Sequence, residues 1–388
     1  MNQKTILYDA MAIRPDPAGV GYVQQRILNE ASKSDNFKFV AYTRQGVHKI
    51  DGLNNKNVTI HYTNYPFYYF GWKRFYFEQF RLTKIIDKYL PDIIHFTTGF
   101  GTPILYRKKS TKIVLTVHDL IPLGPYSELM TKVDMVFYKK TLYDSIEKAD
   151  KIVCISEKAK TDINKYFPEK NNIEIISNGV DEILKPKDSE NIWTQFKEKY
   201  QIDNDIMLYI GGFAPRKNVF SIVKSYHWLL VNKNIKTQLV LSGRFSQTKD
   251  IREQIQTIQK YIKQNNLSKN IILIDYMSQD IKNTLLYKAK LLIYISNAEG
   301  FGIPVLEGLI CGTPVLTSDI APLNTIGLGY ATLCNQGSIQ DISNKIYATL
   351  TNYQKEKTSI KSAKAEILSK YNWAKIGKQY RQIYQKLN

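Results

Sequence analysis

Two acidic residues, Glu299 and Glu307, flank a Gly-rich turn in the segment SNAEGFGIPVLEGLICGTPVLTSD, residues 296–319. Pro304 favours the start of a helix, which would place Glu299 in the preceding turn and Glu307 on the first helical turn. The backbone N–H groups at this helix start can bind a phosphate or another anionic oxygen. The spacing therefore predicts one site in which both acids serve a phosphorylated ligand. A strand, turn and helix with two solvated Glu residues would show the same spacing.

Two cations lie in another loop, where GGFAPRKN, residues 211–218, follows the apolar run IMLYI. Open α/β sheets bind ligands at the carboxyl ends of their strands. Arg216 with its planar fork and Lys217 as a point charge would therefore lie where a diphosphate can bind. Adjacent basic residues in a loop are also common as solvated surface residues.

Strand-like apolar runs alternate with amphipathic helical stretches through the chain, which predicts an α/β protein with parallel sheets covered by helices. In the first half we expect helices at residues 22–33, 72–90 and 131–148, and strands at 5–10, 37–43, 58–62, 93–96, 112–118, 151–156 and 173–176. In the second half we expect strands at 206–210, 238–242, 271–275, 291–295 and 314–317. Each half reads as a Rossmann-like domain.

The segment NGVDEILKPKDS, residues 178–189, interrupts both periodicities and is the best candidate for a linker. We therefore place the domain boundary near residue 185, with domains at 1–185 and 186–371. One more amphipathic helix is predicted at residues 372–388. We expect this C-terminal helix to cross back to the first domain.

Composition narrows the class of protein. A chain of 388 residues with 43% hydrophobic content is not a disordered protein. No apolar run reaches the roughly 20 residues of a membrane span, and no signal peptide is visible, so we expect a cytoplasmic protein. Cys154, Cys311 and Cys334 lie singly in apolar segments, as buried reduced thiols do, and no metal-ligand cluster is visible. The net charge of +19 favours nucleic acid, an anionic membrane or anionic small molecules as partners.

The motifs GGFAPRKN and EGFGIPVLEGLICGTPVLTSD together resemble the family 4 glycosyltransferases, retaining enzymes of the GT-B fold with a Glu-x7-Glu motif. The resemblance implies two Rossmann-like domains with a cleft between them. It implies that Arg216 and Lys217 contact the diphosphate of a nucleotide sugar and that Glu307 binds the ribose hydroxyls. Contacts to the transferred sugar are implied for Glu299 and for the backbone N–H groups of Phe301, Gly302 and Ile303.

In the first domain, TVHDLIPL places His118 at the end of a predicted strand. A His in this position is commonly a packed or solvated residue, whereas the resemblance implies that it approaches the anomeric carbon of the donor sugar. The segment DAMAIRPDPAGVGY, residues 9–22, looks like the glycine loop of the family, in which Gly19 and Gly21 would admit the diphosphate or the acceptor. The loop TTGFGT, residues 97–102, is expected to line the acceptor side.

The resemblance implies a metal-independent, cofactor-independent hexosyltransferase with Glu299, His118 and Lys217 as catalytic residues. Its donor would be a nucleoside diphosphate sugar, with GDP-mannose preferred over UDP-sugars. Its acceptor would be a glycan or a lipid-linked glycan in the synthesis of O-antigen, capsule or exopolysaccharide.

Two alternative functions remain open. A nucleotide-sugar 2-epimerase of the GT-B fold would use the same donor residues without an acceptor. The charge alone would also suit a non-enzymatic binder of nucleic acid or of an anionic surface, although no nucleic-acid module is recognisable.

Residues 61–81 contain eleven aromatic residues beside three basic ones. This composition fits core packing, a groove that stacks on sugars, or an edge in contact with the membrane.

Overall fold

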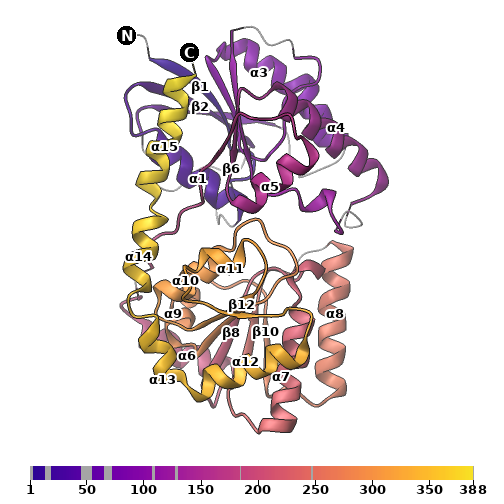
Figure 1. Ribbon diagram of the computed structural model, residues 1–388, viewed down its shortest axis with the longest axis vertical. Helices are drawn as coiled ribbons and strands as arrows, with labels where there is room; N and C mark the ends of the chain where they lie inside the picture. The colour runs from indigo at the N-terminus through magenta and orange to yellow at the C-terminus, as the bar shows by residue number, and fades with distance from the viewer. Residues whose placement is uncertain are drawn as a thin grey trace. The chain divides into compact units, whose positions relative to one another are not determined.

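The chain folds into two compact units in the computed structural model (Figure 1), which describes residues 3–13, 19–44, 55–64, 72–106, 110–126, 130–183, 185–245 and 248–387. Unit 1 comprises Met1–Gly179 and Tyr371–Asn388, and unit 2 comprises Val180–Lys370. Each unit contains one parallel sheet with crossover helices, so the predicted α/β class is confirmed.

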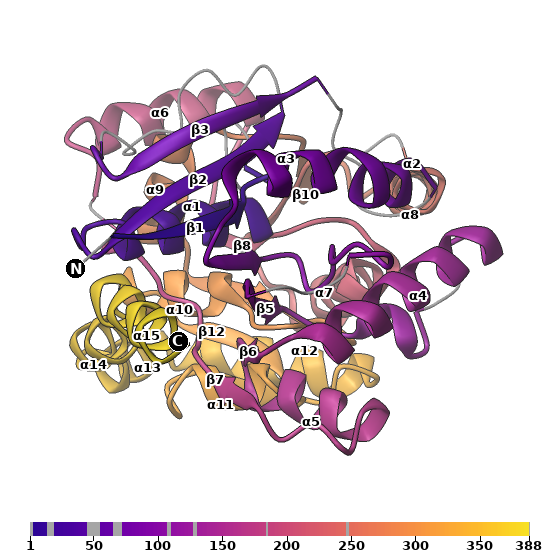
Figure 2. The same ribbon diagram turned by 90° about the horizontal axis from the view of Figure 1, so that it is seen from above.

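Unit 1 is built on a seven-stranded sheet with the order β3-β2-β1-β4-β5-β6-β7, in which neighbouring strands are parallel (Figure 2). Its strands are β1 (Lys4–Asp9), β2 (Phe37–Arg44), β3 (Val58–Thr63), β4 (Ile93–Phe96), β5 (Lys112–Val117), β6 (Lys151–Cys154) and β7 (Ile173–Ile175). Its helical elements are α1 (Val20–Ala31), α2 (Trp72–Tyr76), η1 (Phe77–Arg81), α3 (Leu82–Tyr89), η2 (Ile121–Leu123), α4 (Lys132–Lys148), α5 (Glu157–Tyr166) and α15 (Trp373–Lys386).

The central strands of unit 1 are buried on both faces, because successive side chains point to opposite sides of a strand and helices cover both sides. Leu7 of β1 belongs to a core cluster that also contains Ile86 of α3, Leu142 of α4 and Ile163 of α5. Its neighbour Tyr8, fully buried, donates a hydrogen bond to the carbonyl of Gln24 on α1. The two faces of β1 thus pack against helices on opposite sides of the sheet.

Helix α15 packs on α1 and completes unit 1 (Figures 1 and 2). The Tyr384 hydroxyl lies 2.8 Å from His95 Nδ1, and the Tyr380 hydroxyl lies 3.2 Å from Thr116 Oγ1. Both tyrosines are almost fully buried, so the helix contributes directly to the core of the sheet. The C-terminal helix therefore returns to the first unit, as predicted.

Unit 2 contains a six-stranded parallel sheet with the order β10-β9-β8-β11-β12-β13. Its strands are β8 (Ile206–Ile210), β9 (Gln238–Ser242), β10 (Ile271–Ile274), β11 (Leu291–Tyr294), β12 (Val315–Ser318) and β13 (Thr332–Cys334). Its helical elements are α6 (Ser189–Tyr200), η4 (Pro215–Lys217), α7 (Val219–Lys233), α8 (Lys249–Gln264), α9 (Gln279–Lys288), α10 (Ile303–Ile310), α11 (Leu323–Ile326), α12 (Ile339–Thr351), α13 (Tyr353–Ser359) and α14 (Ala363–Lys370).

The division between the units falls between Gly179 and Val180, earlier than the predicted boundary near residue 185. Hydrogen bonds explain the difference, because the residues after Gly179 are already held by unit 2. Tyr287 donates to the carbonyl of Ile183 over 2.7 Å, and Lys364 pairs with Glu182 over 2.8 Å. Only the first residues of the predicted linker, up to Gly179, belong to unit 1.

One secondary-structure prediction needs correction, and one strand was missed. The helix expected at residues 72–90 is divided into α2, a π-helical turn over η1, and α3. The strand β13 was not predicted, because three residues of partly buried chain show no apolar periodicity. The three cysteines are buried and free, as expected, and burial raises the pKa of each to about 12.

Candidate active site

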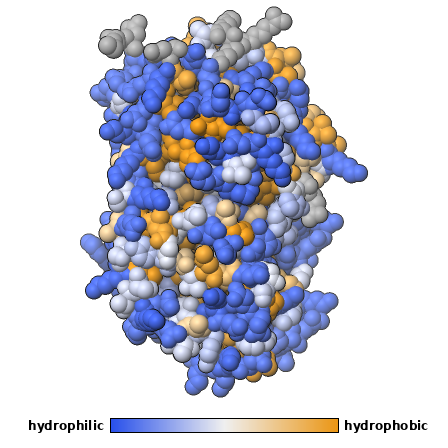
Figure 3. Space-filling view, in the orientation of Figure 1, coloured by the Kyte–Doolittle hydropathy of each residue, from blue (hydrophilic) through white to orange (hydrophobic). Residues whose placement is uncertain are grey.

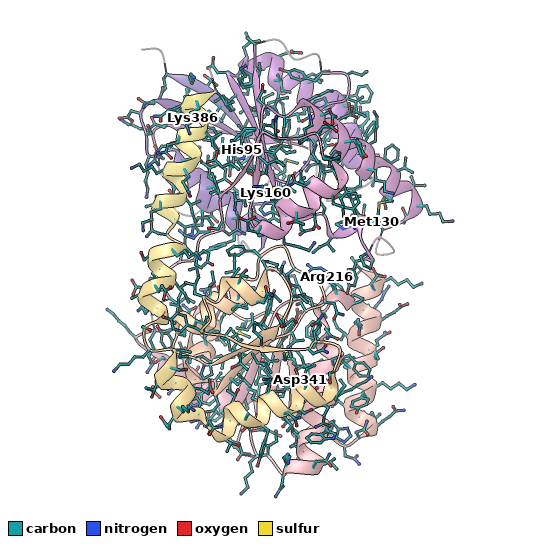
Figure 4. All side chains as sticks on the ribbon, viewed as in Figure 1. His95, Met130, Lys160, Arg216, Asp341 and Lys386 are labelled. Atoms are coloured by element: carbon teal, nitrogen blue, oxygen red, sulfur yellow. The ribbon has the colours of Figure 1, made fainter. Side chains whose placement is uncertain are left out.

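The loop after β8 carries both cations of the candidate site. Gly211 and Gly243 allow it to approach the neighbouring loop closely, since a Cβ atom on Gly243 would lie 1.7 Å from the carbonyl oxygen of Gly211. The Tyr209 hydroxyl donates to the carbonyl of Gly212 over 2.6 Å and so stabilises the turn. The 3₁₀ turn η4 then presents Arg216 and Lys217, and Figure 4 labels Arg216 at the strand ends of the unit 2 sheet.

The loop after β11 carries the acid. Ser318 at the end of β12 holds the first turn, because its hydroxyl accepts from Ser296 N over 2.9 Å and lies 2.7 Å from Ser296 O as a donor. Asn297 N donates to the carbonyl of Arg216 over 2.7 Å, which ties this loop to the loop after β8. The two loops leave adjacent strands, since β8 pairs with β11.

Glu299 lies at the centre of the polar contacts. Its Oε1 accepts from Lys217 Nζ at 2.5 Å, from the Ser296 hydroxyl at 2.7 Å and from the Tyr294 hydroxyl at 3.0 Å. Its Oε2 accepts from Arg216 at 3.3 Å. Burial opposes ionisation, but the charges of Lys217 and Arg216 outweigh it and hold the pKa of Glu299 at about 2. The carboxylate is therefore ionised at neutral pH.

The cluster formed by Arg216, Lys217 and Glu299 has one positive charge in excess. Lys217 also donates to the Tyr294 hydroxyl over 2.8 Å, and Arg216 donates to the carbonyl of Ala298 over 2.8 Å. Tyr294 stays neutral, because burial and Glu299 raise its pKa well above the usual value. The side chain of Arg216 is 25% exposed, so the cluster can be reached by a ligand. Its net charge favours an anionic one.

Helix α10 begins where the sequence predicts it. Gly302 is its N-cap residue at φ 111°, a conformation that favours glycine, and a Cβ atom there would lie 2.4 Å from Leu323 Cδ2. Ile303 is the first helical residue, so its N–H group and that of Gly302 lie at the positive end of the helix dipole. The ring of Phe301 is buried, so only the backbone of this residue suits the predicted contact.

Glu307 has a partner that the sequence does not reveal. It is the fifth residue of α10 and so lies beyond the first turn, one step further than predicted. Its Oε1 accepts from Lys282 Nζ of α9 at 2.6 Å. Glu307 and Glu299 therefore bind different cations. The pair with Lys282 depends on the packing of α9 against α10. No local sequence motif predicts this packing.

His118 follows β5 in unit 1. Its Nε2 lies 2.8 Å from the carbonyl oxygen of Thr97. Since a carbonyl only accepts, Nε2 carries the proton and Nδ1 holds the lone pair of the neutral ring. Burial lowers the pKa of His118, against the opposing effects of this hydrogen bond and of Asp119. The ring is therefore neutral at pH 7.

Gln24, which the sequence did not indicate, connects the loops around His118. Fully buried on α1, it accepts from Ala12 N over 3.1 Å and donates to the Thr97 hydroxyl over 2.5 Å. The Thr97 hydroxyl in turn donates to the carbonyl of Asp9 over 2.7 Å. This network joins the ends of β1 and β4 to the residue that holds His118.

The predicted glycine loop has its ends in the described part of the chain, while residues 14–18 lie outside it. Gly19 is the N-cap of α1 at φ 55°, in the left-handed range of φ. Gly21 lies against the preceding loop, since a Cβ atom there would come within 2.2 Å of the Ala12 carbonyl oxygen. Gly21 thus has a packing role in unit 1.

Unit 1 contains a second ionic cluster, formed by Asp9, Arg74 and Glu78. Arg74 Nε donates to Glu78, and Arg74 Nη2 lies 3.7 Å from Asp9 Oδ2 and 3.3 Å from the Thr98 hydroxyl. All three charged side chains are buried. Burial raises the pKa of Glu78 to about 7, against the opposing charge of Arg74, and it also raises the pKa of Asp9.

The structure thus groups Arg216, Lys217 and Glu299, places Glu307 with Lys282, and places His118, Gly19 and Gly21 in unit 1. Over the described ranges, no group of three or more His, Cys, Asp and Glu side chains is arranged to hold a metal ion. In the same ranges, no helix combines the length and apolar character that a membrane span needs.

Comparison with known proteins identifies relatives over most of the chain. Residues 19–183 match the family described as Glycosyltransferase Family 4, and residues 193–366 match Glycosyl transferases group 1. An uncharacterized glycosyltransferase of Methanocaldococcus jannaschii is 26% identical over 312 residues, which cover 79% of this chain and 78% of that protein.

A second relative is the serotype-specific mannosyltransferase WbdA of Escherichia coli, 27% identical over 271 residues. The match covers 68% of this chain but only 32% of WbdA, so the chain spans about a third of that relative. Among solved structures, sucrose-phosphate synthase from Thermosynechococcus elongatus shares the fold, with a TM-score of 0.79 at 18% identity over 99% of both chains.

Proposed function

Because this chain belongs to the family 4 glycosyltransferases of the GT-B fold, we propose that it transfers a hexose from a nucleoside diphosphate sugar to a glycan or lipid-linked acceptor with retention of configuration. Similarity to WbdA supports mannose as the sugar, and hence GDP-mannose over a UDP-sugar as the donor. It also supports a role in the synthesis of a surface polysaccharide such as O-antigen.

The observation that carries this proposal is the contact of Glu299 with Lys217 and Arg216 beside the start of α10. A diphosphate placed against the two cations would be neutralised by fixed charges and by the N–H groups of Gly302 and Ile303. Glu299, ionised and held by four donors, would accept hydrogen bonds from hydroxyls of the sugar. These residues stabilise the leaving diphosphate without a metal ion or cofactor.

Retention is proposed to follow from front-side substitution. The bond between the anomeric carbon and the diphosphate oxygen breaks, the acceptor oxygen bonds to the same face, and the leaving oxygen takes the acceptor proton. Lys217 stabilises the negative charge that develops on the diphosphate. For His118, whose ring is neutral, we keep the role that the resemblance implies, stabilisation of positive charge at the anomeric carbon.

A transfer assay tests the proposal. Purified protein is incubated with radiolabelled GDP-mannose, UDP-glucose or UDP-galactose and a set of oligosaccharide and polyprenyl-linked acceptors, and glycosylated product is separated from free sugar. We expect transfer from one donor to depend on the acceptor and to retain the anomeric configuration, measured by NMR of the product. A product of inverted configuration would contradict the retaining mechanism.

The same incubation without an acceptor and a separate measurement of DNA binding separate the alternatives. Interconversion of epimeric nucleotide sugars without any acceptor would identify the protein as a 2-epimerase. Salt-dependent binding of DNA, with no affinity for any nucleotide sugar, would support the nucleic-acid alternative. The Glu299 and Glu307 motif beside Arg216 and Lys217 favours the transferase over both alternatives.

We propose further that the protein is cytoplasmic and contacts anionic membrane lipids through unit 1. Helices α2 and α4 touch, with the rings of Phe75 and Phe137 5.0 Å apart. The exposed side chains of α2, α4 and the neighbouring η1, called here the apolar basic face, are Tyr76, Phe80, Val133, Val136, Lys73, Lys132, Lys139 and Lys140. Figure 3 shows hydrophobic and hydrophilic atoms side by side at the upper right edge of unit 1, where α4 lies in Figure 1.

Such a face suits the interface of a bilayer, where rings enter the headgroup region and lysines meet anionic lipids. Co-sedimentation with vesicles tests this. We expect binding to anionic but not zwitterionic vesicles, weakened by salt and by the double substitution Phe80→Ser and Val136→Ser. The matched control is Val231→Ser, which removes a side chain of unit 2 that is 72% exposed. Equal binding of both variants would contradict the assignment.

A further inference from the structure

Thr97 contacts the ring of His118, and its own position is set by hydrogen bonds to two other segments of unit 1. Its carbonyl oxygen lies 2.8 Å from His118 Nε2. Its hydroxyl accepts from Gln24 Nε2 over 2.5 Å and donates to the carbonyl of Asp9 over 2.7 Å. The side chain of Thr97 is therefore anchored on both sides, and this anchoring restricts the direction of its carbonyl group.

The direction of each hydrogen bond in this chain is defined. Ala12 N only donates, so the Gln24 atom that lies 3.1 Å from it is the amide oxygen. The amide nitrogen of Gln24 then donates to Thr97, which leaves the hydroxyl proton of Thr97 for the Asp9 carbonyl. Completing the chain requires a donor and an acceptor together at position 24.

Burial distinguishes Gln24 and Thr97 from His118. Gln24 is fully buried and Thr97 is 1% exposed, so an unmade hydrogen bond at either residue would cost free energy. The backbone of Gln24 is held as well, since its carbonyl accepts from the Tyr8 hydroxyl over 2.8 Å. His118 is partly exposed and makes no second hydrogen bond within the described ranges, so its Nδ1 lone pair can serve a ligand.

We infer that Gln24 is a positioning residue for His118, which it holds through Thr97 in one orientation with the proton on Nε2. This inference rests on the proposed function, in which His118 stabilises positive charge at the anomeric carbon. In this tautomer Nδ1 offers a lone pair to that charge, whereas the other tautomer would offer an N–H group. Gln24 acts through Thr97 and needs no contact with the substrate.

A purely structural role of Gln24 is the competing explanation. Through Ala12 it also joins the segment after β1 to helix α1, so its loss should lower stability in either case. The two explanations differ in the folded protein. A positioning residue changes the rate only while His118 is present, whereas a structural residue changes it regardless of His118.

A double-mutant cycle between Gln24 and His118 tests the inference. Gln24→Met keeps the approximate length of the side chain and removes its hydrogen bonds. Transfer rates are measured for the unaltered protein, Gln24→Met, His118→Ala and the double variant. We expect Gln24→Met to reduce kcat about tenfold in the unaltered protein and less than about twofold in the His118→Ala protein. The KM for the nucleotide sugar should be unchanged, because the proposed donor contacts lie in unit 2.

Substitutions of Thr97 give an independent test. Thr97→Val keeps the shape and the carbonyl group but loses the hydroxyl, so it should reduce kcat about as much as Gln24→Met. Thr97→Ser keeps the hydroxyl and should restore a nearly unaltered rate. The matched control is Gln238→Met, which removes a buried amide at the start of β9 that accepts from Asp203 N over 3.0 Å. This control should lower stability without changing kcat. Thermal melting verifies that each variant is folded.

Three results would overturn the inference while leaving hexose transfer itself in place. An equal fall of kcat in Gln24→Met with and without His118 would establish a structural role. Unchanged kcat in folded Gln24→Met would exclude any role in the rate. Unchanged kcat in His118→Ala would remove the residue on which Gln24 is inferred to act. Absence of transfer by the unaltered protein from every donor would instead overturn the proposed function, and this inference with it.

Discussion

The two sheets have the same topology at their centres, yet the ionic clusters beside them differ in sign and in burial. In each sheet the strand order reverses at one point, between β1 and β4 in unit 1 and between β8 and β11 in unit 2. Ligands of open α/β sheets bind beside such a switch point. The cluster of unit 2 has two cations and one acid and is partly exposed, whereas that of unit 1 has one cation and two acids and is buried.

This difference shows that topology places charged groups but does not decide their use. Glu299 and Glu78 are the same residue type, and burial penalises the charge of both. Two cations hold the pKa of Glu299 at about 2, whereas a single cation shared with Asp9 leaves the pKa of Glu78 at about 7. The cluster of unit 2 therefore keeps a fixed positive excess for a ligand. The cluster of unit 1 is buried, so we expect it to affect the stability of the fold.

The largest expected effect is on the stability of unit 1. Arg74→Ala should lower the free energy of unfolding by about 3–5 kcal/mol, because it leaves two buried carboxylates without their shared cation. Urea unfolding of unit 1 measures this change. The nucleotide affinity of the folded variant should be unchanged, because the residues proposed to bind the nucleotide lie in unit 2. Arg81→Ala, which removes an exposed cation of the same π-helical turn, is the control. Unchanged stability in Arg74→Ala would show that the cluster is not structural.

The next effect is on activity in unit 2. Glu299→Ala and Lys217→Ala should each reduce kcat by at least about a hundredfold, since each removes a charged contact formed near the transition state. Steady-state transfer rates measure this, with Lys224→Ala on the exposed side of α7 as the control. Near-normal rates in both variants would refute the assignment of the cluster.

A smaller effect is expected for the ribose site. Glu307→Ala should raise the KM for the donor about tenfold and leave kcat nearly unchanged, because it removes binding shared by the ground state and the transition state. Lys282→Met should raise this KM less, since Glu307 would keep its carboxylate but lose the partner that orients it. A decrease confined to kcat in Glu307→Ala would show that Glu307 does not act on the ribose.

The smallest expected effect is on how the free energy of unfolding changes with pH. Glu78 has a folded pKa of about 7, above the roughly 4.3 of an unfolded Glu, so the folded state holds a proton that the unfolded state has lost. Its contribution to stability is present below the unfolded pKa and is lost as pH rises through about 7. Glu78→Gln should flatten this decline, measured by urea unfolding between about pH 4.5 and 7.5.

Glu299 should act in the opposite direction and in a separate range. Its folded pKa of about 2 lies below the unfolded value, so its contribution is lost as pH falls from the unfolded pKa toward about 2. Glu299→Gln should therefore lower the free energy of unfolding by a constant amount above the unfolded pKa and should remove its dependence on pH only in the acid range. A changed slope of stability against pH above pH 5 in Glu299→Gln would contradict the charges assigned to the two clusters.

The sequence predicts those parts of the fold and site that depend on neighbours in the chain. Strands β4, β8 and β9 have the bounds predicted from their runs, because burial on both faces makes these runs mostly apolar. The grouping of Arg216, Lys217 and Glu299 follows from two strand ends that lie next to each other in a sheet. Apolar runs are sufficient to predict the strand bounds. Local motifs, together with the rule that ligands bind at the carboxyl ends of parallel strands, are sufficient to predict the grouping of the three charged residues.

Residues that depend on packing between helices leave no such signal. Lys282 reaches Glu307 only because α9 packs beside α10, and Gln24 reaches Thr97 only because α1 covers the sheet. Arg74 and Glu78 are separated by one helical turn and look like a solvated pair in the sequence. Glu78 also lies in the π-helical turn η1, which the helical periodicity of residues 72–90 conceals.

Because of helix α15, the two units have all their residues available at different stages of synthesis. Unit 2 is one continuous stretch, Val180–Lys370, and all of it has left the ribosome before residues 371–387 follow. Unit 1 can bury His95 against Tyr384 only after those last residues appear. Unit 1, although its strands are made first, is therefore completed only after all of unit 2 has been made.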